Sequence, residues 1–186
     1  MIAKEYLFED VQSVFPIVTN GDGNCLYRSI STFVTGSEKN WAELKLKAAY
    51  FLDQKKEGFQ NVFRRMGEKT DEVIHDLMSN KVWGGPAQII VVASLLNRPI
   101  VVYGAHPNIP QNCRIGNCIS NHSLSHFSYH PIFSQNPSSP IYIFFTTQSS
   151  RSFKDQKRNN HFVPLLALDP SGYQIFGNNP PQTTWN

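Results

Sequence analysis

The order of helical and extended patterns along the chain constrains its fold more than any other feature. Between residues 25 and 96, apolar side chains recur at helical spacing in successive segments, separated by glycine, proline or polar stretches. Short apolar runs with β-branched residues follow at residues 100–103 and 141–145, and again from residue 161 onward. Helices first and strands later are typical of an α+β domain, in which the helices pack on a small central β-sheet.

The sequence also marks where several of these elements begin and end. Pro16 places a short strand at residues 13–19 on a sheet edge, because proline cannot donate a hydrogen bond to a central ladder. Lys45 is expected on the polar face of its helix, opposite the apolar side chains. The helices with the clearest expected bounds are 25–36, 41–58 and 86–96.

Length and composition indicate one folded unit. A chain of 186 residues with a hydrophobic fraction of 40% can bury a sufficient core without disulfides or a metal. We place one domain at residues 1–176 and a Pro/Asn/Gln-rich tail or linker at residues 177–186. We expect the protein to be a monomer.

Charge, cysteine content and hydropathy exclude several classes of protein. The net charge of +3, from 17 basic and 14 acidic residues, is too small to indicate nucleic-acid binding. An odd set of 3 cysteines argues against a secreted disulfide framework, and residues 1–12 lack the apolar segment of a signal peptide. The longest apolar stretch, residues 89–102, is too short and too interrupted to cross a bilayer. We therefore expect a cytoplasmic protein without a membrane partner, in the host cytosol if its source is a pathogen.

Cys25 is the candidate nucleophile. A cysteine attacks as the thiolate, and a helix N-terminus or a nearby imidazolium lowers the pKa of its thiol. Residues 21–24 (GDGN) form a tight turn, and Cys25 stands where the following helix begins. The unpaired N–H groups of a helix start also favour a developing oxyanion. A free cysteine is more often a small core residue, so this context is what favours chemistry.

His161 is the candidate base among 6 histidines. Four of the others lie in the polar segment 104–140, and His75 lies within a helical pattern. His161 alone stands where a polar loop meets an apolar strand, and a strand holds an imidazole more rigidly than a loop does. Cys25 and His161 therefore form the predicted nucleophile–base pair.

Three segments of the chain resemble the OTU (ovarian tumour) family of papain-like cysteine proteases. Residues 21–29 (GDGNCLYRS) resemble its Asp-Gly-x-Cys segment, and residues 160–165 (NHFVPL) resemble its histidine segment. Residues 83–85 (WGG) and 97–103 (NRPIVVY) resemble its middle block. The three segments occur in family order across residues 20–168, and this makes the resemblance far more specific than one motif would be.

The resemblance implies a papain-like OTU fold and a deubiquitinase that needs no cofactor or metal. Such an enzyme hydrolyses the isopeptide bond after the C-terminal glycine of ubiquitin, so the implied partners are ubiquitin, polyubiquitin chains or ubiquitin-like proteins. Cys25 would be the nucleophile, His161 the base, and Asp22 a supporting residue that shapes the loop. The backbone N–H groups of Asp22, Gly23, Asn24 and Cys25 would form the oxyanion hole.

Val163 departs from the family pattern. Many members have Asp or Asn two residues after the catalytic histidine, where it orients the imidazole. The orienting group here would be Glu9, Asp10, a neighbouring asparagine, or no residue at all. Asn160 is disfavoured because adjacent residues of a strand point to opposite faces. A Cys–His dyad without an orienting group would work with reduced activity.

Two other functions stay open at this stage. Val163 fits a catalytically weak or silent ubiquitin-binding module, and the polar tail fits a protease domain of a larger polyprotein. Residues 104–140 are expected to form a long insertion that influences substrate choice. Cys113 and Cys118 lie in this insertion, but their spacing to the nearby histidines is too loose to predict zinc.

Overall fold

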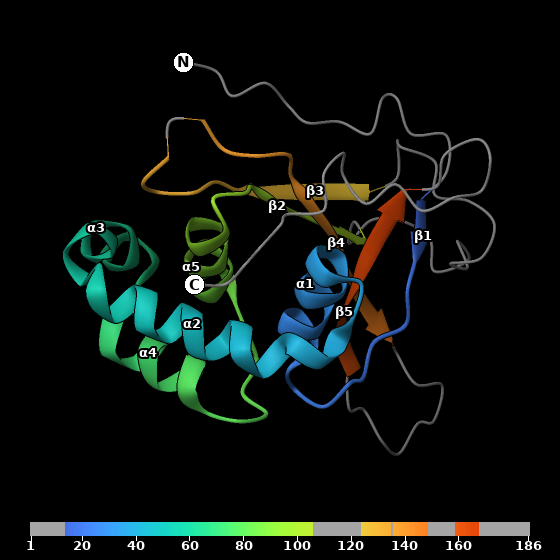
Figure 1. Ribbon diagram of the computed structural model, residues 1–186, viewed down its shortest axis with the longest axis horizontal. Coiled ribbons are helices and arrows are strands. Elements are labelled where there is room, and N and C mark those ends of the chain that lie inside the picture. Colours follow the sequence, from blue (N-terminus) through green and yellow to red (C-terminus); the bar gives the residue numbers. More distant parts are fainter. Residues whose placement is uncertain (1–13, 106–123, 135, 149–158, 168–186) are drawn as a thin grey trace.

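The computed structural model describes residues 14–105, 124–134, 136–148 and 159–167. Helices dominate its first half and strands its second half (Figure 1). The fold is α+β, as the order of sequence patterns predicts. The elements in chain order are β1 (Val14–Pro16), α1 (Cys25–Thr35), the 3₁₀ helix η1 (Glu38–Asn40), α2 (Trp41–Gln54), α3 (Lys56–Met66), α4 (Thr70–Met78), α5 (Pro86–Leu96), β2 (Ile100–Ala105), β3 (Leu124–Tyr129), β4 (Ile141–Gln148) and β5 (Asn159–Ala167).

The strands form one sheet in the order β1-β5-β4-β2-β3. Strands β2 and β4 pair in parallel, and the other neighbours pair antiparallel. The edge position of β1 confirms the expectation drawn from Pro16, which pairs with Leu165 of β5. This order places β5 between β1 and β4, so backbone hydrogen bonds hold both of its sides.

Helices cover one face of the sheet in two layers. Helix α1 packs against β5 and α5 contacts β2 and β3, while α2 packs on α1, α4 and α5 (Figure 1). Alternate residues of β2 serve the two faces: Ile100 and Val102 belong to the large core under the helices. Val101 and Tyr103 belong to a smaller apolar cluster on the opposite face. Among the described residues, no helix has the length and apolar character needed to cross a membrane.

The helix expected over residues 41–58 is wrong, because the chain breaks at Lys55 between α2 and α3. Lys55 has a φ of −121° and a ψ of 22°, outside the helical range. The break redirects α3 so that Phe59 and Phe63 are buried, with the Phe59 ring 6.1 Å from that of Phe51. Burial of these two phenylalanines therefore outweighs continuous helical hydrogen bonding.

Two further expectations are corrected by the structure. Lys45, expected on a polar face, is only 3% exposed and lies inside the molecule. The segment 104–140, expected as a long loop, contains β3, which pairs with β2 along its whole length. Ser125, His126 and Ser128 interrupt the apolar residues of this edge strand, and this hides β3 from a search for apolar runs.

Candidate active site

Cys25 lies at the first position of α1, and the turn before it requires glycine. Gly23 has a φ of +87°, and a Cβ at this position would lie 2.5 Å from the carbonyl oxygen of Lys81. Only glycine satisfies both the left-handed backbone and this close approach. We call residues 20–25, which end at the predicted nucleophile, the nucleophile loop. Its last residue, Cys25, is a free thiol only 2% exposed.

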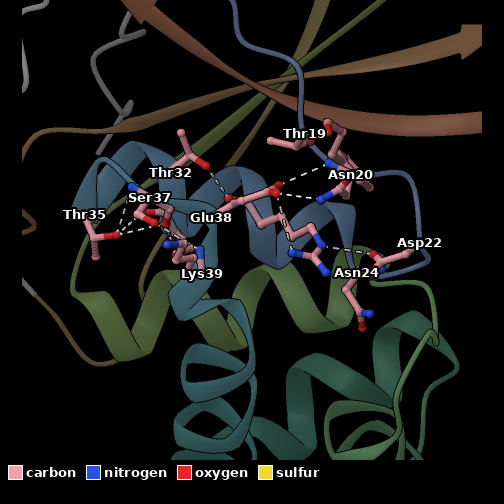
Figure 2. A network of polar contacts seen from close by, with 12 residues as sticks. Thr19, Asn20, Asp22, Asn24, Thr32, Thr35, Ser37, Glu38 and Lys39 are labelled. Carbon is pink, nitrogen blue, oxygen red and sulfur yellow. Dashed lines mark hydrogen bonds and ion pairs between the residues drawn. The ribbon is translucent and has the colours of Figure 1, made fainter.

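Charged side chains hold the nucleophile loop from its outer side (Figure 2). Arg28 donates to both carboxylate oxygens of Asp22, from Nε at 3.1 Å and from Nη2 at 2.6 Å. Glu38 lies 3.8 Å from the Arg28 guanidinium and accepts hydrogen bonds from the backbone and side-chain nitrogens of Asn20 at 3.1 and 2.7 Å. We call these four residues, Asn20, Asp22, Arg28 and Glu38, the outer clamp. It ties the first half of the loop, at Asn20 and Asp22, to η1 and α1.

Asp22 shapes the loop from within this clamp. Its Oδ1 also accepts a hydrogen bond from the backbone N–H of Asn24 at 3.0 Å. The hydrogen bonds from Arg28 are the main reason why the pKa of the Asp22 carboxyl lies well below its usual range. The backbone N–H of Asn24 is already engaged by Asp22. Of the four predicted donors for an oxyanion, the backbone N–H groups of Asp22, Gly23 and Cys25 therefore remain.

His161 is the third residue of β5, inside the strand rather than at its entrance. Its Nε2 lies 2.9 Å from the carbonyl oxygen of Thr19 and 3.3 Å from the Thr19 hydroxyl. A carbonyl oxygen only accepts, so we assign the ring proton to Nε2, and Nδ1 is then the basic nitrogen. Nδ1 faces the nucleophile loop, because a Cβ on Gly21 would lie 3.7 Å from this nitrogen.

Cys25 meets the histidine strand at the residue next to His161. The backbone of Phe162 hydrogen-bonds with the Cys25 sulfur and lowers the pKa of its thiol. Burial has the larger effect and raises the pKa of Cys25 above its ordinary value. The helix start at Cys25 predicts a thiol with a lowered pKa, and burial in the structure reverses this direction. Proton transfer to a nearby base is therefore needed to form the thiolate.

A family model described as OTU-like cysteine protease matches residues 20–136. This chain belongs to the OTU-like cysteine protease family. A comparison with curated protein sequences finds no match.

Solved OTU domains share the fold at low sequence identity. The OTU domain of OTUD1 is 17% identical, with a TM-score of 0.59, over 82% of this chain and 85% of that domain. The viral OTU domain protease from Dera Ghazi Khan virus is 18% identical, with a TM-score of 0.56, over 85% and 88%. The Hazara virus OTU, solved bound to ubiquitin, is 14% identical, with a TM-score of 0.55, over 88% and 86%.

Val163 occupies the position where many OTU proteases keep the residue that orients the histidine. It is 7% exposed and packs in the apolar cluster with Val101, Tyr103 and Phe144. The structure instead places Thr19 against the imidazole, and the Thr19 hydroxyl also donates to the Phe162 carbonyl oxygen at 3.0 Å. Sequence reasoning missed Thr19 because a backbone carbonyl leaves no signature in residue type.

The other suggested orienting groups lie outside the part that the structure describes. Glu9 and Asp10 precede the first described residue, and the side chain of Asn160 is not described. Cys113 and Cys118 also lie outside the described residues. Within the described ranges, no group of three or more His, Cys, Asp or Glu side chains could hold a metal ion.

Residues 83–85, the first part of the middle block, lie beside the other two OTU-like segments. Trp83 contacts the rings of Phe145 and Phe162, each with a centroid distance of 5.9 Å. A Cβ on Gly84 would collide with Leu26 at the start of α1. The fold therefore gathers the nucleophile loop, the Trp83 turn and the histidine strand at one place, although they are far apart in sequence.

Proposed function

We propose that this OTU-like cysteine protease is a deubiquitinase that uses Cys25 as nucleophile and His161 as base. Its substrate would be the isopeptide bond after the C-terminal glycine of ubiquitin or a ubiquitin-like protein. Membership of the OTU family supports the reaction class. The ubiquitin bound to the Hazara virus OTU, which shares the fold, supports the choice of substrate. Cys25 must stay a free thiol for this chemistry, and a reducing compartment would maintain it.

The reaction would begin with a proton transfer from Cys25 to Nδ1 of His161. The thiolate would then attack the carbonyl carbon of the C-terminal glycine and form a tetrahedral intermediate, whose oxyanion accepts hydrogen bonds from the nucleophile loop. The imidazolium would return its proton to the departing lysine amine, which leaves a thioester on Cys25. Water activated by His161 would hydrolyse the thioester and restore the thiol.

The contact between His161 and Thr19 fits this sequence of proton transfers. Nε2 keeps its proton and its hydrogen bond to the Thr19 carbonyl whether the ring is neutral or protonated. A carbonyl dipole stabilises an imidazolium in the same direction as a carboxylate would, but carries no full charge. We therefore expect the Thr19 carbonyl to orient the imidazole through both proton transfers.

Two observations carry the proposal: the hydrogen bond between the Cys25 sulfur and the backbone of Phe162, and the approach of the His161 ring to Gly21 of the nucleophile loop. Its test is the hydrolysis of ubiquitin that carries a fluorogenic amide at its C-terminus. Cys25→Ala should abolish turnover, and His161→Ala should lower kcat by about a thousandfold. His75→Ala is the matched control, because this side chain is 80% exposed on α4, and it should behave as wild type.

One alternative has an observation in its favour. The buried thiol with its raised pKa, in a chain that has Val163 at the family's orienting position, fits a silent module that binds ubiquitin. Binding of ubiquitin measured by titration calorimetry, without any turnover in the fluorogenic assay, would select this alternative. Absence of both binding and turnover would instead point to another substrate protein.

A further inference from the structure

Lys45 is a charged side chain buried beneath the nucleophile loop. It lies on α2 and is only 3% exposed. Its Nζ donates to the carbonyl oxygen of Ser79 at 2.5 Å and to Oδ1 of Asn24 at 3.4 Å, and it lies 4.8 Å from the centre of the Tyr27 ring. A buried ammonium costs free energy unless such partners compensate it. Burial accordingly lowers the pKa of Lys45, while the charges of Asp76 and Asp22 act in the opposite direction.

Asn24 is the partner of Lys45 on the loop, and its side chain is fully buried. Figure 2 shows this side chain pointing away from Glu38 and Asn20, into the molecule. Its Oδ1 also accepts from the backbone N–H of Lys81 at 3.2 Å, and its Nδ2 donates to Oδ1 of Asn80 at 3.0 Å. Four polar contacts therefore link Lys45, Asn24 and the turn at residues 79–81. We call these residues together the inner anchor.

The inner anchor fixes the backbone from which the oxyanion donors come. Lys81 has a φ of +60°, an uncommon value for a residue other than glycine, and its carbonyl faces Gly23. Lys45 donates one hydrogen bond to the turn, at Ser79, and one to the loop, at Asn24, and so holds the two together. Cys25 itself belongs to α1, whose helical backbone and core contacts position the sulfur independently.

We propose that Lys45 is a positioning residue that acts through Asn24 to hold the backbone on either side of it, at Gly23 and Cys25, in the geometry that binds the oxyanion. This inference rests on the proposed function, since it concerns one step of that reaction. The other role open to Lys45 is support of the overall fold. The two roles differ in what they predict for reactions of Cys25 that develop no oxyanion.

The test compares two reactions of the same thiol. Hydrolysis of a ubiquitin C-terminal amide passes through an oxyanion, whereas alkylation of Cys25 by iodoacetamide does not. Lys45→Met keeps the length and apolar stem of the side chain and removes its donors. We expect it to lower kcat by about tenfold or more, in the range seen for weakened oxyanion binding. KM and the alkylation rate should stay within about twofold of wild type, because uniform binding and thiol position are unchanged.

The matched control is Lys47→Met, two residues along the same helix, where the side chain is 34% exposed and pairs with Glu43. It should leave both reactions unchanged. Asn24→Ala removes the same contact from the loop side and is the second variant if Lys45→Met does not fold. Wild-type kcat in Lys45→Met, or a parallel fall of kcat and alkylation rate, would overturn the proposal.

Failure of the proposed function has a different signature. Wild-type protein would then release no fluorophore from the ubiquitin amide. The anchor would in that case be tested by hydrogen–deuterium exchange, which reports opening of the backbone. Lys45→Met should speed amide exchange in residues 20–25 relative to Lys47→Met, and equal exchange in the two variants would contradict the anchoring itself.

Discussion

The nucleophile loop and the histidine strand are held in place by different kinds of contact. Side chains hold the loop: Asp22 and Arg28 from outside, Asn24 and Lys45 from beneath. Backbone pairing with β4 and β1 holds the strand, and a backbone carbonyl contacts His161. A substitution other than proline removes side-chain contacts and leaves the backbone hydrogen-bonding groups in place. We therefore expect activity to be sensitive to substitution in the loop and tolerant of it around the histidine.

The largest effect is expected at Gly23. Gly23→Ala adds a Cβ against the Lys81 carbonyl at a φ of +87° and should displace the oxyanion donors. We expect kcat to fall by about a hundredfold or more. The strain should lower the free energy of unfolding by about 1–3 kcal/mol, measured by urea denaturation.

Gly67→Ala provides the matched control for this substitution. Gly67 has a φ of +77°, but a Cβ there would meet nothing within 4 Å. It should lose about 1–2 kcal/mol of stability from the backbone alone and keep full activity. Full activity in Gly23→Ala would contradict the importance that we give to the loop.

A smaller effect is expected from the outer clamp. Asp22→Asn keeps an oxygen for the Asn24 amide and removes the charge that Arg28 binds. We expect kcat to fall by about tenfold, because one charge-assisted contact of the loop is weakened. An Arg28→Met variant should match it, and additive losses in the double variant would show that the two side chains act separately.

The pH dependence of stability tests the same pair. The pKa of Asp22 is lower in the folded protein than in the unfolded chain, where it is about 3.9. The ion pair therefore stabilises the fold above about pH 4, and this contribution is lost as the pH falls toward the folded pKa. The stability difference between wild type and Asp22→Asn, at most about 1 kcal/mol for a solvent-screened pair, should shrink below about pH 4 in thermal denaturation. A difference that is constant from pH 7 to pH 3 would contradict the pairing.

Thr19 should be more tolerant than Asp22. Thr19→Ala removes the hydroxyl contacts with His161 and Phe162 and leaves the backbone carbonyl in place. We expect kcat to fall by only about threefold with an unchanged KM, and Thr19→Ser to restore it. A hundredfold loss would show that the hydroxyl, rather than the carbonyl, orients the imidazole.

The smallest effect on activity is expected at Val163. Val163→Asn places an amide at the position where other OTU proteases orient the histidine, but the site is apolar and 7% exposed. We expect no gain in kcat and a loss of about 1–3 kcal/mol in the free energy of unfolding. Val101→Asn, in the same cluster, should show the same stability loss. A clear increase in kcat would show that the enzyme lacks an orienting group that Val163→Asn supplies.

The residue types at the ends of helices predicted those helix bounds that depend on neighbouring residues alone. Gly36 ends α1 in a left-handed conformation, and Pro86 begins α5, as their residue types indicate. Cys25 at the start of α1 also follows from its turn. These features depend on the conformational preferences of a few neighbouring residues, which the sequence states directly.

Contacts between distant segments could not be predicted in the same way. The donors and acceptors around Asn24 come from Lys45, Asn80 and Lys81, and nothing in their spacing marks them as partners. Lysine is usually exposed, so the sequence predicts Lys45 on the polar face of α2, whereas it is buried. Thr19 contacts His161 across 142 positions of the chain, and only the pairing of β1 with β5 brings them together.

The most direct test is to incubate the protein with ubiquitin that carries an electrophile at its C-terminus and to map the modified residue by mass spectrometry. The chain has 3 cysteines, so the site of reaction is informative. We predict one adduct, on Cys25, which is absent in Cys25→Ala and forms much more slowly in His161→Ala. An adduct that persists in Cys25→Ala, or that maps to Cys113 or Cys118, would contradict the assignment of the nucleophile.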